Sequence, residues 1–309
     1  MSTKGAAVLL LLGAIWGASF MFIKVGGEEM QPFFLVEIRL SLAAVVLGLV
    51  SLTRPGVFRL MRTHWPTMIM IGLLNCAIPY TLITWGETHI SSGMAAILNA
   101  LTPLWVGALG FAWVWAERLS AGRLIGLVMG LAGVGLVVSG NFEHQGEADT
   151  TLFLLGQGAV MLGALSYAVA GVYGRHKLHG LPVYVGATGQ LITGAIMILP
   201  FALFEIPSQV PSIQAIGSVV TLSIVGTAVA ALLFYWLLTN VGTIGTLLVT
   251  YLLPPFALLW GALFLHETAT LWAILGLALI LLGITFTSGR VGVIMGRRSK
   301  GAAAKIGSE

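Results

Sequence analysis

The chain has 309 residues, of which 58% are hydrophobic and only 8% are charged. Soluble domains carry about 25% charged residues, so this composition excludes a soluble enzyme with a single membrane anchor. Continuous apolar runs of roughly 20 residues suit helices that cross a hydrocarbon core of about 30 Å, whereas the strands of membrane barrels alternate over shorter segments. The composition therefore predicts an all-α membrane protein.

The first predicted helix covers residues 6–25. Its apolar run continues through Trp16 and Phe20 to Ile23 without a cleavage pattern, which favours a membrane helix over a signal peptide. Charges, prolines and polar clusters then divide the chain into ten transmembrane helices in total, near residues 6–25, 33–52, 66–86, 92–114, 120–139, 152–174, 183–204, 214–238, 243–265 and 270–288.

Basic residues predict the orientation. With ten helices both termini share one side, and 13 of the 15 Lys and Arg residues fall on that side: Lys4, Arg54, Arg59, Arg62, Arg118, Arg123, Arg175, Lys177, Arg290, Arg297, Arg298, Lys300 and Lys305. Lys24 and most acidic residues fall on the other side, and Arg39 lies within a helix. Basic loops stay in the cytoplasm, so we expect a multi-pass protein of the inner (plasma) membrane with both termini cytoplasmic.

The two halves of the chain resemble each other at an offset of 150 or 151 residues. The matching pairs are Leu12-Gly13-Ala14 with Leu162-Gly163-Ala164, His89–Pro103 with Asn240–Pro254, and Glu117, Gly126 and Gly133 with Glu267, Gly276 and Gly283. Five helices are an odd number, so the second half enters the membrane in the opposite direction. Inverted repeats are typical of alternating-access transporters, whose substrates bind near the bilayer midplane; a duplication kept only for packing is the alternative.

The duplication predicts a domain organisation. Residues 1–141 form the first repeat (helices 1–5), 142–150 a linker loop, 151–289 the second repeat (helices 6–10), and 290–309 a basic cytoplasmic tail.

Several motifs carry a resemblance to a known family. They are Gly13-Ala14-Ile15-Trp16-Gly17 in the first helix, Pro103 with Glu117-Arg118-Leu119-Ser120, the second copy at Pro254 and His266-Glu267, and the glycine-spaced helices Gly126–Gly133 and Gly276–Gly283. In this order the chain resembles the EamA-type branch of the drug/metabolite transporter superfamily over nearly its whole length. The resemblance implies a five-plus-five inverted fold, cytoplasmic termini, and movement, often export, of amino acids or similar metabolites.

Prolines within predicted helices suggest where a solute binds. Proline frees the carbonyl four residues earlier, and in lipid that carbonyl needs another partner or a water-filled cavity. The freed carbonyls belong to polar residues: Asn75, Asn99, Thr250 and Tyr251. With nearby aromatic residues they predict a site for aromatic or other apolar side chains, formed by Trp16, Asn75, Pro79, Tyr80, Asn99, Pro103, Trp105, Thr250, Tyr251 and Pro254. The alternative is that these polar side chains only join neighbouring helices.

Charged residues within the helices are few. Glu37 and Arg39 lie in the second helix, where we favour ion pairing or packing over a proton relay. Gln190 is a lesser candidate for the site. Glu117 and Glu267 are interpreted as structural, because a carboxylate favours a helix N-terminus.

These observations predict a secondary transporter that exports amino acids or similar small metabolites by alternating access. The alternatives are a uniporter or channel-like permease for other solutes, or an intramembrane enzyme, which the six histidines at loops and helix ends do not favour. We expect no catalytic residue, metal or cofactor. The expected partners are a small-molecule substrate and membrane lipids, not nucleic acid, and the protein is expected to be a monomer or a homodimer.

Overall fold

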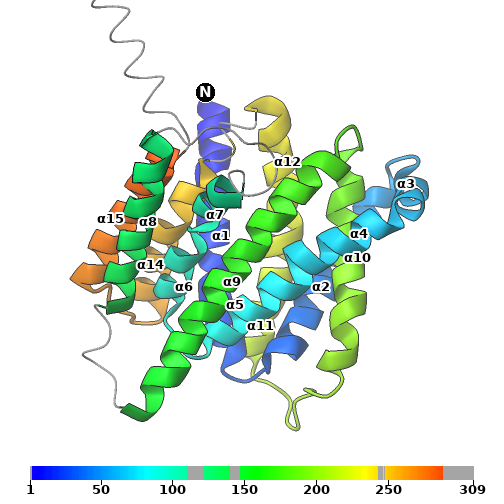
Figure 1. The fold of residues 1–309 in the computed structure, drawn as a ribbon. Coiled ribbons are helices and arrows are strands. Elements are labelled where there is room, and N and C mark those ends of the chain that lie inside the picture. Colours follow the sequence, from blue (N-terminus) through cyan, green and yellow to red (C-terminus); the bar gives the residue numbers. More distant parts are fainter. Residues whose placement is uncertain (1, 110–120, 140–146, 243–245, 247, 288–309) are drawn as a thin grey trace, which may run out of the picture. The chain divides into compact units, whose positions relative to one another are not determined.

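The computed structural model describes residues 2–109, 121–139, 147–242, 246 and 248–287 (Figure 1). Within these residues seven helices are long and apolar enough to cross a membrane, and three further apolar helices are shorter. Apolar side chains such as Leu11, Leu49 and Leu162 are more than half exposed, as expected of surfaces that face lipid. The predicted all-α membrane fold of ten helices is confirmed.

In the first half, the third and fourth predicted helices are interrupted. The elements are α1 (Thr3–Gly27), α2 (Pro32–Leu52), α3 (Val57–Thr63), α4 (Trp65–Gly72), the π-helix η1 (Leu73–Ala77), α5 (Ile78–Glu87), α6 (Ser92–Asn99), α7 (Thr102–Leu109) and α8 (Ala121–Ser139). The short α3 lies outside the predicted helices and follows Gly56, whose φ of 81° is a left-handed value that glycine adopts at little cost.

The second half follows the same order with one exception. Its elements are α9 (Glu147–Lys177), α10 (Val183–Ala202), α11 (Ile213–Ser223), the π-helix η4 (Ile224–Val229), α12 (Ala230–Asn240), α14 (Val249–Phe264) and α15 (Leu271–Thr287). It has no counterpart of α3 among the described residues between α10 and α11. Three predicted features lie outside the described residues: Glu117 with the end of the fourth helix, most of the linker 142–150, and the basic tail 290–309.

The chain forms two compact units, and each unit contains helices from both halves. The larger unit comprises residues 1–100 and 145–269, and the smaller unit residues 101–144 and 270–309. This division into units reflects helix packing and differs from the division into sequence repeats. The repeat boundaries concern the duplication of the chain, and they stay a prediction.

The first helices of the two halves run in opposite directions within the larger unit (Figure 1). Near the end of α1, Lys24 Nζ donates to the carbonyls of Glu87 (2.6 Å) and Ile90 (2.9 Å). Near the beginning of α9, Gly156 packs against His89 and Ile90 of the same connection. Therefore α9 begins where α1 ends, as the inverted repeat requires.

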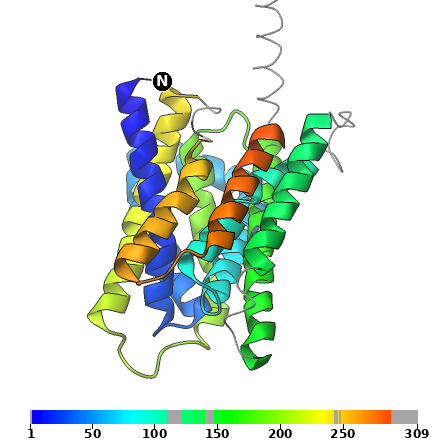
Figure 2. The same ribbon diagram turned by 90° about the vertical axis from the view of Figure 1, so that its left-hand side faces the viewer.

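The glycines of the first-helix motif form a packing surface on α14. A Cβ atom added at Gly13 would lie 2.7 Å from Leu252 Cβ, and one at Gly17 would lie 2.6 Å from Phe256 Cβ. The two helices lie side by side in both views (Figures 1 and 2). The indole N–H of Trp260 donates to the carbonyl of Ala14 (3.0 Å). Small residues let helices approach closely in membranes, so this motif joins the two halves.

Three carboxylates hold helix N-termini at the end of the larger unit where α1 ends. Glu267 accepts from the backbone N–H of Ser92 (2.8 Å) and of Gly93 (3.1 Å) at α6. Glu205 accepts from the N–H of Phe33 (2.7 Å) at α2. Each carboxylate satisfies donors that a helix leaves without intrahelical partners. Glu267 thus has the structural role expected of it, but at α6 of the other half rather than at the helix that follows it.

Glu29 makes the third of these contacts. It accepts hydrogen bonds from the hydroxyl and the backbone N–H of Ser212, at the start of α11. These bonds favour the ionised carboxylate and lower the pKa of Glu29 below its ordinary value. The contact therefore persists wherever this carboxyl group is ionised.

In the smaller unit, α8 and α15 pack through glycines. A Cβ atom at Gly133 would lie 2.7 Å from the carbonyl oxygen of Gly276, and one at Gly283 would lie 2.7 Å from the backbone N of Gly130. The glycine spacing of these helices therefore serves packing within the chain.

We expect Gly133→Ala to lower the stability of the protein in detergent by about 1–3 kcal/mol, because the added methyl group has no space against the α15 backbone. Thermal unfolding of the purified protein measures this effect. Gly135→Ala is the matched control, since a Cβ atom at Gly135 on the same helix meets nothing within 4 Å. Equal unfolding temperatures for the two variants would contradict the proposed packing.

Candidate substrate-binding cavity

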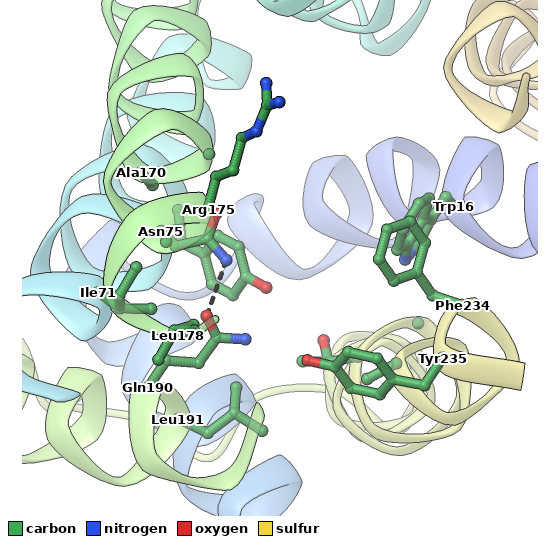
Figure 3. A pocket seen from close by; sticks show the side chains of 16 residues that line it. Trp16, Ile71, Asn75, Ala170, Arg175, Leu178, Gln190, Leu191, Phe234 and Tyr235 are labelled. Carbon is green, nitrogen blue, oxygen red and sulfur yellow. Dashed lines mark hydrogen bonds between the residues drawn. The ribbon is translucent and has the colours of Figure 1, made fainter. Parts of the chain in front are cut away.

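A cavity of about 410 Å³ lies within the larger unit and is lined by 16 residues (Figure 3). Its volume falls within the range of about 300–1,000 Å³ that is common for small-molecule sites. The first half contributes residues from α1, α4, η1 and α5, and the second half from α9, α10, η4 and α12. The cavity is therefore built by both halves. Inverted-repeat transporters bind their substrates at such an interface between the repeats.

One wall of the cavity carries a pair of amides. Asn75 Nδ2 donates to Gln190 Oε1 at 2.8 Å, joining η1 to α10. Asn75 lies in the π-helical turn directly before Pro79, where the N–H of Ile78 reaches the carbonyl of Leu73, five residues earlier. The wider turn changes the direction of the following side chains, and π-helical turns are frequent at functional sites.

A second π-helical turn occupies the corresponding position in the second half. In η4 the N–H of Ala230 reaches the carbonyl of Val225, five residues earlier. Gly226 and Thr227 of this turn also line the cavity. η1 and η4 therefore occupy equivalent positions in the two repeats and line the same cavity, although only η1 is followed by a proline.

The opposite wall is aromatic. The rings of Trp16 and Phe234 lie 5.5 Å apart between centroids, and Phe234 and Tyr235 lie 6.0 Å apart, edge to face. In Figure 3 these rings face the Asn75–Gln190 pair across the cavity. An amide wall facing an aromatic wall suits a ligand with one polar and one apolar end.

Arg39 lies behind two lining residues. Its Nε donates to Thr227 Oγ1 at 3.0 Å, and its guanidinium carbon lies 3.8 Å from the centroid of the Tyr80 ring. Glu37 instead accepts from the Ser41 hydroxyl at 2.5 Å. Within the described residues Glu37 and Arg39 do not pair with each other, so Arg39 has a packing and hydrogen-bonding role on the cavity side of α2.

The cavity extends to the exposed residues Gly171 and Arg175 near the end of α9. The opposite end of the same unit is where Lys24 and Glu267 hold the α5–α6 connection. Glu87 lies at that end with 1% of its surface exposed, although the charge pattern assigns it to the outer side of the membrane.

The structure brings three of the ten predicted site residues to the cavity: Trp16, Asn75 and Tyr80. Pro79 is buried in the same helix as Tyr80. The other predicted residues lie elsewhere: Asn99 at the end of α6, Thr250, Tyr251 and Pro254 in α14, and Pro103 and Trp105 in α7 of the smaller unit.

Several lining residues were not predicted. Gln190, a lesser candidate, lines the cavity, and so do Thr227, Phe234 and Tyr235, which the sequence pattern does not assign to the site. Composition alone does not show which face of an apolar helix turns inward. The adjacent aromatic residues Phe234, Tyr235 and Trp236 are the sequence signal for α12.

The sequence profile of the EamA-like transporter family matches twice, at residues 3–139 and at residues 154–289. Together the two matches span most of the chain. The chain belongs to the EamA-like transporter family. Membership in this family makes it a transporter rather than an enzyme, and a transporter implies a small-molecule substrate.

Relatives of this EamA-like transporter cover it nearly end to end. The uncharacterized transporter YoaV of Bacillus subtilis is 28% identical over 89% of this chain and 94% of its own. The uncharacterized inner membrane transporter YedA of Escherichia coli is 26% identical over 91% and 89%. A probable terminal-alkyne amino-acid exporter of Streptantibioticus cattleyicolor is 24% identical over 96% of each chain.

A solved crystal structure shares the fold. It superposes with a TM-score of 0.65 at 21% identity and covers 96% of this chain and 99% of its own. This likeness concerns the fold alone.

We expect Gly171→Cys, made in a Cys76→Ala background, to react with a water-soluble maleimide in membranes. A Cβ atom at Gly171 meets nothing within 4 Å, and the residue lines the cavity. Leu162→Cys on the same helix is the control, because Leu162 is 57% exposed but does not line the cavity, and we expect it to face lipid, where the reagent does not partition. Mass spectrometry of the labelled protein measures both, and equal labelling would contradict a hydrated cavity.

Proposed function

We propose that this EamA-like transporter is a secondary carrier that exports amino acids, in particular aromatic or other apolar ones, by alternating access. The observation that carries the proposal is the cavity built by both inverted halves, with amides on one wall and aromatic rings on the other. An amino acid with an apolar side chain has the same division into a polar and an apolar end.

Alternating access needs one end of the site to be closed while the other is open. The cavity reaches the exposed end of α9. At the opposite end Glu267 of the second half holds the N-terminus of α6 of the first half. This contact between the halves must break when the site opens to that end, which fits rocking of one repeat against the other.

The distribution of basic residues supports a cytoplasmic location for both termini, and hence a site open to the cytoplasm in this state. The relative YedA, named as an inner membrane transporter, supports the same membrane for this chain. The relative named as a probable amino-acid exporter supports the substrate class. We keep Asn99, Thr250 and Tyr251 as proposed substrate contacts in another state of the cycle.

Purified protein in liposomes tests the proposal by counterflow of labelled amino acids. A carrier exchanges its substrate and saturates, whereas a channel-like permease shows flux without saturation. Saturable exchange of aromatic or apolar amino acids is the expected result. No exchange of any amino acid by protein that is folded and inserted would overturn the proposed substrate class.

We expect Asn75→Leu to reduce counterflow by at least about tenfold while leaving the protein folded. Leucine has a similar volume but removes the amide that donates to Gln190, and an unpaired polar partner in an apolar site costs about 1–3 kcal/mol. Asn240→Leu is the matched control, since Asn240 is an exposed amide at the end of α12. Equal flux in both variants would remove the amide pair from the site.

A further inference from the structure

We propose that Arg39 is the fixed positive charge that makes the cavity select substrates carrying a carboxylate. The proposal rests on the proposed function, because it takes the cavity between the two halves as the substrate site. It adds the chemical feature of the substrate that the protein recognises and the residue that recognises it.

Arg39 carries a buried charge inside the membrane-spanning part of the chain. Only 7% of its surface is exposed, and no carboxylate of the described residues forms an ion pair with it. Its guanidinium contacts the hydroxyl of Thr227 and the ring of Tyr80, both of them neutral. Charged groups at membrane depth are costly and usually pair with an opposite charge, so a negative charge from outside the chain is the missing partner.

Neither Glu37 nor Glu87 pairs with Arg39 in the part of the chain that the structure describes. Glu37 accepts a hydrogen bond from Ser41, one turn along the same helix. Both carboxylate oxygens of Glu87 are buried without a hydrogen-bond partner among the described residues, so Glu87 forms no ion pair with Arg39 there. Neither carboxylate lines the cavity.

The cavity itself has a positive character. Both neutral contacts of Arg39, Tyr80 and Thr227, line it, so the guanidinium stands directly behind its wall. Arg175 lies at its exposed end, and among the described lining residues no acidic side chain occurs. Charges interact over several ångströms in a poorly polarisable interior, and a substrate carboxylate beside Thr227 is attracted from both positions.

The arrangement also orients the substrate. A carboxylate drawn towards Thr227 and Tyr80 leaves the apolar part of the ligand to the rings of Trp16, Phe234 and Tyr235. Tyr80 is fixed by Arg39 on one side and by an edge-to-face contact with Tyr167, whose centroid lies 6.4 Å away. The positive charge and the aromatic wall therefore select different parts of the same molecule.

The test compares ligands that differ only in the carboxylate. Each acid is paired with its primary amide, which has nearly the same shape. The pairs are phenylalanine with phenylalaninamide, leucine with leucinamide, phenylpropionate with phenylpropionamide, and lactate with lactamide. Binding to the purified protein is measured as a thermal shift, and transport as counterflow in liposomes. Wild-type protein is expected to prefer the acid of at least one pair by about tenfold or more.

Four variants assign this preference to Arg39. Arg39→Gln removes the charge. Thr227→Asp leaves Arg39 in place but neutralises it with a carboxylate at its Nε. Both variants are expected to lose the preference for the acid while still binding the amide. Arg39→Lys keeps a positive charge and is expected to retain part of the preference. Arg59→Gln removes one exposed cation of α3, outside the cavity, and is expected to leave the preference unchanged.

A purely structural role for Arg39 would lower the binding of acid and amide by the same factor, and that result in folded Arg39→Gln and Thr227→Asp protein would overturn the proposal. A wild-type protein that binds no acid better than its amide would overturn it as well. If carboxylates other than amino acids bind selectively but no amino acid is exchanged, the charge selection stands and the proposed amino-acid substrate fails.

Discussion

Inside a bilayer, the backbone must satisfy its own hydrogen bonds, since no water is present to replace a missing partner. This constraint keeps most of the chain in regular α-helices and makes each departure from them informative. Two departures among the described residues of the larger unit are the π-helical turns η1 and η4, and both place residues on the cavity. Widening a helix to i→i+5 bonding keeps the backbone paired while turning Asn75 and Thr227 towards the same space.

The same constraint applies to helix ends, where four N–H groups have no intrahelical partner. At the end of the unit where α1 ends, carboxylates of Glu29, Glu205 and Glu267 accept these donors from helices distant in sequence. Lys24 donates hydrogen bonds to the carbonyls of Glu87 and Ile90, which lie at the end of a helix and in the loop that follows it. These contacts connect the loops through charge, whereas the middle of the unit is held by small residues such as Gly13 and Gly17. A contact of this kind at a helix end is easier to break during transport than close backbone packing.

Much of the fold follows from the sequence because hydropathy and charge act on whole segments. Each predicted helix overlaps a described helix, and the odd number of helices per half explains the opposite directions of α1 and α9. The site follows less well, because lining depends on which face of each helix turns inward. Trp16, Asn75 and Tyr80 line the cavity, but Thr250 and Tyr251 do not. The turn at η4 lacks the proline that made Asn75 a candidate, and the partner of Glu267 lies 174 or 175 residues away.

The pairing of α8 with α15 has a consequence for biosynthesis. α8 ends at Ser139 and α15 ends at Thr287, so at roughly 5–20 residues per second about 7–30 s of translation separate the insertion of the two helices. For that interval the glycine face of α8 lacks the backbone of α15 and is available to lipid or to the insertion machinery. The smaller unit is accordingly the last part of the chain to mature, and a ribosome that stalls before residue 271 leaves α8 in the membrane without its partner helix.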